Sequence, residues 1–102
     1  MTVGRIAIIG VGLIGGSLGL AFRTAGGFDV TGVDSDPAAL DAAVERGAID
    51  RGTTDPAAGA AGADVVFVCT PVLQIPAVVA GIAQSLKAGA IVTDVGSTKG
   101  FV

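Results

Sequence analysis

The sequence contains no histidine, tyrosine or tryptophan and only one cysteine. Histidine is the usual proton acceptor near neutral pH, so acid–base chemistry would have to use a carboxylate, a lysine or the cysteine, or borrow an imidazole from elsewhere. One cysteine cannot form an internal disulfide or a zinc site, so we expect no metal centre. Nothing in the cysteine content points to an oxidising compartment, and we expect a cytoplasmic location.

Charged residues are also scarce, at 15% of the chain, and the formal net charge is −3. This balance argues against nucleic acid and anionic membrane surfaces as partners. The apolar runs are too short for a membrane span, and glycines interrupt the one at the amino terminus, where a signal peptide would lie. Because 51% of the 102 residues are hydrophobic, we expect one folded domain over residues 1–102 that binds small molecules or protein.

Short apolar runs alternate with longer amphipathic stretches, which is typical of a βαβα chain. Gly26-Gly27 predicts the end of the first helix, and Asp36-Pro37 and Asp55-Pro56 predict the starts of the next two. Right-handed crossovers then give an α/β fold, a Rossmann-type doubly wound parallel sheet of order 3-2-1-4-5. The predicted strands cover 6–9, 28–34, 48–52, 65–69 and 91–94, and the predicted helices cover 13–25, 37–46, a short stretch from 56, and 73–86.

Gly10, Gly12 and Gly15 form a G-x-G-x-x-G pattern between the first strand and the first helix. In this position the glycines allow a tight turn, the approach of a phosphate to the backbone, and close packing of helix on strand. Asp34 lies about twenty residues further on, at the end of the second strand, where a carboxylate accepts hydrogen bonds from an adenosine ribose. The same carboxylate would repel a 2′-phosphate, and Ser35 supplies no cation, so NAD is favoured over NADP.

The segments after the fourth and fifth strands should lie at the same end of the sheet, where ligands bind in such folds. They contain Thr70-Pro71 and, further on, Asp94 to Lys99. Taken singly, these residues also fit an ordinary turn, a strand-end cap and a solvated charge. Cys69 ends an apolar strand with no base beside it in the sequence, so we expect a core residue without chemistry.

Three segments together resemble the nucleotide-binding domain of the prephenate/arogenate dehydrogenase family: GVGLIGGSLGLAF at 10–22, CTPV at 69–72 and IVTDVGSTKGFV at 91–102. The resemblance runs over essentially the whole chain. It implies an NAD- or NADP-dependent oxidative decarboxylation of prephenate to 4-hydroxyphenylpyruvate, or of arogenate to tyrosine, in tyrosine biosynthesis. In that family a hydride leaves the ring carbon that bears the hydroxyl, a histidine takes the hydroxyl proton, and loss of carbon dioxide makes the ring aromatic.

The resemblance also implies roles for individual residues. Ser97 matches the family's catalytic serine, between the substrate hydroxyl, the nicotinamide and the histidine, and Lys99 would add positive potential for a dianionic substrate. The cofactor-binding positions are Gly10, Gly12, Leu13, Ile14 and Gly15 at the pyrophosphate, Asp34 at the ribose, and Thr70, Pro71 and Val72 on the nicotinamide side.

The 102 residues depart from the family pattern in one respect. The family histidine lies in a G-H-P segment beyond the serine motif, and the substrate-binding arginine and dimer-forming helices lie in a carboxyl-terminal helical domain. None of these is present. We therefore expect a truncated or isolated cofactor-binding domain that lacks the helical domain, binds NAD, is inactive alone and self-associates through its open sheet edge and uncovered apolar face. The homodimer would belong to full-length family members.

Two alternatives from the sequence remain open. A non-catalytic NAD(H)-sensing module would also lack histidine, although it would have no use for the match from Ser97 to Lys99. Half of another NAD-dependent hydroxy-acid dehydrogenase would share the glycine pattern, but the continuation I-G-G-S-L disfavours it.

Overall fold

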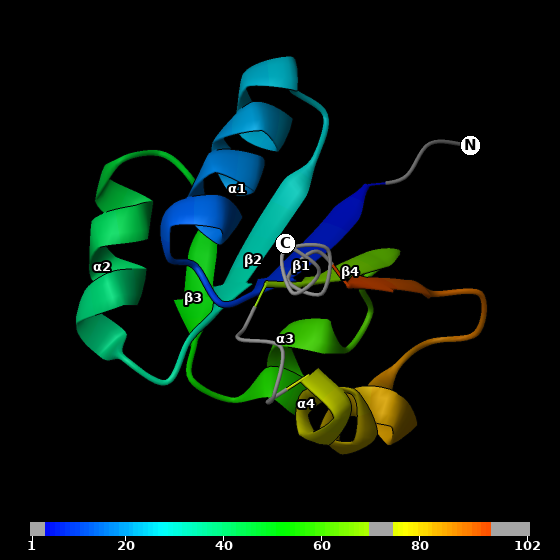
Figure 1. Cartoon of the computed structure of the whole chain (residues 1–102). Coiled ribbons are helices and arrows are strands. Elements are labelled where there is room, and N and C mark those ends of the chain that lie inside the picture. The colour runs from blue at the N-terminus through cyan, green and yellow to red at the C-terminus, as the bar shows by residue number, and fades with distance from the viewer. Residues whose placement is uncertain (1–3, 70–74, 95–102) are drawn as a thin grey trace, which may run out of the picture.

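The computed structural model describes residues 4–69 and 75–94, which form a five-stranded parallel sheet of order β3-β2-β1-β4-β5. Figure 1 shows this sheet with helices packed against it. The predicted fold class and strand order are therefore confirmed. In chain order the elements are β1 (Arg5–Ile9), α1 (Leu13–Ala25), β2 (Asp29–Val33), α2 (Pro37–Glu45), β3 (Arg51–Thr53), α3 (Pro56–Ala60), β4 (Val65–Val68), α4 (Ile75–Ile82), the 3-10 turn η2 (Ala83–Ser85) and β5 (Ile91–Asp94).

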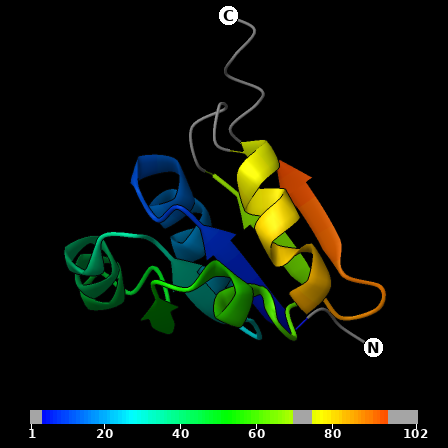
Figure 2. The ribbon, with the colours of Figure 1, turned by 90° about the horizontal axis from the view of Figure 1, so that it is seen from below.

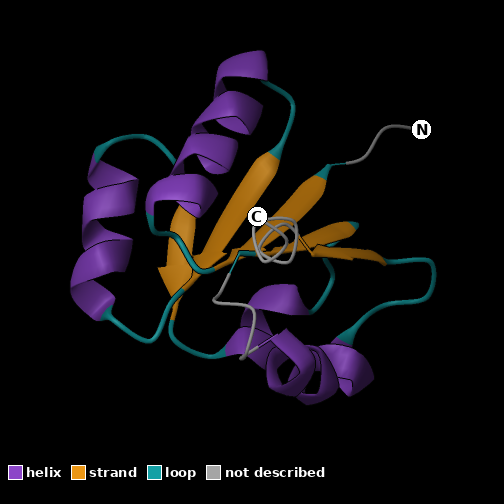
Figure 3. Ribbon diagram, in the orientation of Figure 1, coloured by secondary structure: helices purple, strands orange, loops and turns teal. Residues whose placement is uncertain are grey.

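The central strand β1 is buried on both faces, as a parallel strand between two helical layers must be. Ile6 and Ile8 pack toward α1 and α2, and Ala7 and Ile9 pack toward α3 and α4. All four side chains are at most 3% exposed. Figure 3 shows the two helical layers on opposite faces of the strands. The unbroken apolar run of β1 thus serves two cores at once.

The predicted capping signals act where expected. Gly26 ends α1 with φ 81°, and its N–H donates to the Phe22 carbonyl at 3.1 Å. The Asp36 carboxylate accepts from Ala38 N–H at 3.0 Å, with Pro37 as the first residue of α2. Asp55 caps α3 in the same way. An N-cap of this kind stabilises a helix by about 1 kcal/mol.

Two predicted elements were wrong in their bounds by more than one residue. The third strand covers Arg51–Thr53 instead of 48–52, because Ala48 and Ile49 are buried in the connection that follows α2. These two residues are apolar because they are buried in the core, and not because they pair within the sheet. The last predicted helix ends early, since α4 stops at Ile82 and a 3-10 turn carries the chain on to Leu86, which is extended. Residues 73 and 74 lie outside the described part of the chain.

Figure 2, which views the ribbon from below, shows α4 lying alongside β4 and β5. Val78, Val79 and Ile82 on α4 pack with Val92 of β5 in the same apolar cluster. Over the described residues, none of the helices has both the length and the apolar character needed to cross a lipid bilayer.

Candidate functional site

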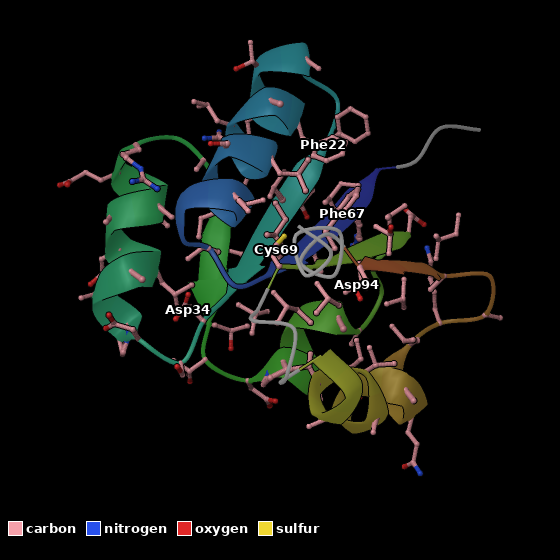
Figure 4. All side chains as sticks on the ribbon, in the orientation of Figure 1. Phe22, Asp34, Phe67, Cys69 and Asp94 are labelled. Atoms are coloured by element: carbon pink, nitrogen blue, oxygen red, sulfur yellow. The ribbon has the colours of Figure 1, made fainter. Side chains whose placement is uncertain are left out.

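The carboxyl ends of the parallel strands meet at one edge of the sheet and border a cleft of about 410 Å³. Gly10 follows β1, Asp34 follows β2 and Cys69 follows β4. Figure 4 labels Asp34, Cys69 and Asp94, which belong to this edge. The described lining consists of Ile9, Gly10, Gly12, Val33, Asp34, Ser35, Thr54, Pro56, Cys69 and Val78. This is the edge at which ligands bind in open α/β sheets.

A second hollow, of about 330 Å³, lies at the opposite edge, among residues that include Asp29, Thr31 and Arg51. Three of its polar side chains are bonded to one another. The Arg51 guanidinium donates to the Asp29 carboxylate at 2.8 Å and to the Thr31 hydroxyl at 3.3 Å, and the bond to Arg51 lowers the pKa of Asp29. We therefore regard the cleft at the carboxyl edge as the functional site.

Two glycines of the motif are required by the protein's own backbone. Gly10 has φ 94°, a left-handed conformation that side chains disfavour, and its N–H donates to the Val33 carbonyl at 2.7 Å. A Cβ added to Gly15 would lie 1.9 Å from the Gly10 carbonyl oxygen. These two glycines hold the turn after β1 against the first turn of α1.

Gly12 is different, because its lack of a side chain is not explained by packing. It is the N-cap of α1 and lines the cleft, and an added Cβ would meet nothing within 4 Å among the described residues. The first helical bond runs from Gly16 N–H to the Gly12 carbonyl at 2.7 Å. The preceding N–H groups at the helix start therefore lack partners within the helix, and together with the helix dipole they suit an anion.

The Asp34 carboxylate is half-buried and is tied to two backbone groups. Its Oδ2 accepts from Val11 N–H at 3.1 Å, and its Oδ1 accepts from Asp36 N–H at 3.0 Å. The first of these bonds connects the end of β2 to the glycine turn. A carboxylate has about four acceptor positions, so each oxygen can still accept a hydrogen bond from a ligand in the cleft.

Cys69 lies on the cleft wall, so the expectation of a core residue is wrong in part. The strand β4 ends at Val68, and the Cys69 side chain is only half-buried. Burial raises the pKa of the Cys69 thiol to about 11, and the negative charge of Asp94 adds to the effect. The thiol is therefore protonated at neutral pH, and it is a poor nucleophile.

The structure brings together part of the predicted site. Gly10, Gly12 and Asp34 line the cleft, whereas Ile14 and Gly15 lie in the first turn of α1, which Leu13 opens, and do not line it. The remaining predicted positions, Thr70, Pro71, Val72, Ser97 and Lys99, lie outside the described residues.

Sequence reasoning missed several lining residues. Ser35 and Thr54 follow the ends of β2 and β3, so the rule that ligands bind at strand ends could have found them. Pro56 and Val78 reach the cleft from α3 and α4. No local pattern marks those two positions, because only the packing of the helices brings them there.

A glycine turn after the central strand, a helix starting at that turn and a carboxylate at the end of the next strand define a Rossmann-type dinucleotide-binding domain. The sequence model of the family described as "Prephenate dehydrogenase, nucleotide-binding domain" matches residues 18–102. The chain belongs to this family, and the resemblance noted from its motifs is confirmed. Because the match begins at residue 18, the glycine motif is separate support for nucleotide binding.

Individual relatives agree with this assignment. The chain is 35% identical over 96 residues to prephenate dehydrogenase from Bacillus subtilis (strain 168), covering 92% of this chain and 26% of that protein. The structure of Synechocystis arogenate dehydrogenase is 34% identical with a TM-score of 0.83, over 89% of this chain and 32% of that one.

The structure of prephenate dehydrogenase from Aquifex aeolicus in complex with hydroxyphenyl propionate and NAD+ is 31% identical, also with a TM-score of 0.83. That alignment covers 92% of this chain and 34% of the relative. The chain therefore spans about a quarter to a third of the length of these relatives.

Proposed function

We propose that the cleft at the carboxyl edge binds NAD. The observation that carries the proposal is the space at Gly12, at the start of α1, where no described residue would lie within 4 Å of an added Cβ. The free N–H groups of that helix start would hold the diphosphate, and the remaining acceptor positions of Asp34 would hold the adenosine ribose. The relative from Aquifex aeolicus that was solved with NAD+ supports the choice of cofactor.

The charge of the cleft favours NAD over NADP. With the ribose held at Asp34, a 2′-phosphate would lie beside this carboxylate, and no basic side chain is found in the described lining of the cleft. A phosphate beside this carboxylate would be repelled and would lack an arginine or lysine partner.

We further propose that the chain is the nucleotide-binding portion of a dehydrogenase that oxidatively decarboxylates prephenate or arogenate in tyrosine biosynthesis. Membership of the family and the printed activities of the relatives support this assignment. Because the 102 residues include no histidine, they would contribute cofactor binding and not the base. The protein would act in the cytoplasm, as a homodimer in its full-length form, on a small-molecule substrate.

The positions outside the described residues receive roles within the same proposal. NAD+, when bound, accepts a hydride from the substrate. Thr70, Pro71 and Val72 would border the nicotinamide, and the hydroxyl of Ser97 would orient the substrate hydroxyl against it. Lys99 would add positive potential for an anionic substrate.

Calorimetric titration of the 102-residue chain with NAD+, NADH and NADP+ tests the cofactor proposal. We expect NAD+ to bind and NADP+ to bind at least about tenfold more weakly, since a phosphate facing a carboxylate costs about 1.4 kcal/mol or more. Asp34→Asn should narrow that difference. Asp41→Asn, the same change at an exposed position on α2, should leave it unchanged. A folded sample that shows neither heat nor a thermal upshift with saturating NAD+ would end the proposal.

A second assay tests whether the chain supplies the cofactor site without the catalytic base. When prephenate and NAD+ are added to the chain alone, we expect no NADH to form. Robust turnover would show that these 102 residues supply the base as well as the cofactor site.

A further inference from the structure

The order of the strands fixes the order of the groups along the carboxyl edge. Asp34 lies at the end of β2, Gly10 at the end of the central β1, and Cys69 and Asp94 on the far side, at β4 and β5. In the parallel register Val68 is opposite Asp94, so Asp94 stands beside the end of β4, one residue before Cys69. The views in Figures 1 and 4 agree with this order.

The described part of the cleft is acidic. Its ionisable lining residues are Asp34 and Cys69, and neither carries a positive charge. The thiol is neutral, because burial and the negative charge of Asp94 both raise the pKa of Cys69. Because Asp94 is opposite Val68 in the register and Cys69 follows Val68, Asp94 lies next to the cleft wall at the β4 end.

The position of the nicotinamide follows from these two facts together with the proposed function, on which this step rests. With the ribose at Asp34 and the diphosphate at Gly12, the other half of a dinucleotide must extend past Gly10 toward Cys69. The nicotinamide ring carries a positive charge when it is oxidised and none when it is reduced. We propose that Asp94 is a specificity residue for the oxidation state of the cofactor, and that its carboxylate favours NAD+ over NADH at the β4–β5 end of the cleft.

This charge has a consequence for the reaction direction. Hydride transfer to NAD+ cancels the positive charge on the ring, so the attraction to Asp94 disappears as the reduced cofactor forms. Asp94 would thereby strengthen binding of the oxidised cofactor before the reaction and contribute nothing to binding of the reduced cofactor after it.

The test is to measure the dissociation constants of NAD+, NADH and ADP-ribose for the wild-type chain and for Asp94→Asn. One charge pair at the protein surface, partly screened, should change the affinity by about threefold to tenfold. We expect NAD+ to bind that much more weakly to Asp94→Asn, and NADH and ADP-ribose to bind as before. Glu45→Gln removes one negative charge from the exposed far end of α2 and should alter none of the three.

A second measurement needs no variant. If the preference is electrostatic, raising the salt concentration should reduce the wild-type ratio of the NADH dissociation constant to the NAD+ dissociation constant. Should the variant fail to fold, a wild-type ratio that does not change with salt would still overturn the inference.

The outcomes separate the two proposals. If both cofactors bind but their ratio is the same in Asp94→Asn and insensitive to salt, Asp94 is not a specificity residue and the NAD site stands. An equal loss of NAD+, NADH and ADP-ribose would assign Asp94 a structural role and overturn the inference. If no cofactor binds to the folded wild-type chain, both proposals fail.

Discussion

Gly12 and Gly15 belong to one motif, yet a methyl group at each should damage a different property of the protein. The methyl group of Gly12→Ala would meet no described residue within 4 Å, so the cost to folding should be about 1 kcal/mol or less, arising from alanine's weakness as an N-cap. The same methyl group would fill the space over the start of α1. A hydrogen bond to a charged group contributes about 1.5–3 kcal/mol, so losing one should weaken NAD+ binding about tenfold to a hundredfold.

Gly15→Ala should instead destabilise the fold. The new carbon would lie 1.9 Å from the Gly10 carbonyl oxygen and 3.1 Å from Cγ2 of Ile8, so the turn after β1 would have to move away from α1. Overpacking against backbone costs about 3 kcal/mol. The better helix propensity of alanine returns about 1 kcal/mol, which leaves a net loss of about 2 kcal/mol in the free energy of unfolding.

Urea unfolding and NAD+ calorimetry on both variants separate the two effects. Gly81→Ala is the matched control, because this glycine is exposed on α4 and an added Cβ would have no neighbour within 4 Å in the part of the chain that the structure describes. It should leave NAD+ affinity unchanged and stabilise the fold by up to about 1 kcal/mol. Wild-type affinity in Gly12→Ala would refute the placement of the diphosphate, and wild-type stability in Gly15→Ala would refute the packing argument.

Two further predictions concern titratable groups. Asp64 accepts hydrogen bonds from the Lys87 ammonium and from the N–H groups of Arg5 and Gly4. These bonds lower the pKa of Asp64 from its ordinary value of 3.8. The stability that the ionised carboxylate contributes is therefore present above pH 3.8 and is lost as the pH falls below it. The difference in unfolding free energy between wild type and Asp64→Asn should therefore be full near neutral pH and shrink below about pH 4; a constant difference would contradict this. The Cys69 thiol, with its pKa raised from 9.0 to about 11 by burial and a neighbouring carboxylate, should react with an aromatic disulfide reagent about tenfold more slowly than the unfolded chain at the same pH, because the lower thiolate fraction is partly offset by the greater nucleophilicity of that thiolate. Equal rates would show an accessible thiolate.

Much of the fold could be predicted because its signals are local. The Asp36-Pro37 and Asp55-Pro56 pairs start helices through contacts with the next few residues, and the buried run of β1 depends on its own composition. The third strand was misplaced because Ala48 and Ile49 are apolar in order to fill a core, while the pairing with β2 falls on Arg51–Thr53. Burial and pairing coincide in the central strands, but not at the edge.

Among the site residues, too, those with a local signal were predicted and those that depend on packing were missed. Gly10, Gly12 and Asp34 were found because a turn, a helix start and a strand end can be recognised from neighbouring residues. Val78 was missed because its place in the cleft depends on how α4 packs over β4, which involves residues far apart in the sequence. The exposure of Cys69 was missed for a similar reason, since it depends on β4 ending one residue earlier than its apolar run suggests.

Asp34 couples cofactor choice to the shape of the turn. Its Oδ2 accepts from Val11 N–H inside the glycine motif, and its Oδ1 accepts from Asp36 N–H, so the carboxylate that faces the cleft also positions the backbone that would hold the diphosphate. Replacing it with alanine would remove a ribose acceptor and also leave the Val11 N–H without this partner, in a half-buried position where an unmade hydrogen bond costs about 1–3 kcal/mol. Asparagine keeps one acceptor oxygen and removes the charge. A change of preference toward NADP therefore requires two alterations, a cation for the phosphate and a retained acceptor for the turn, whereas Asp34→Asn alone should only narrow the difference in affinity between the two cofactors.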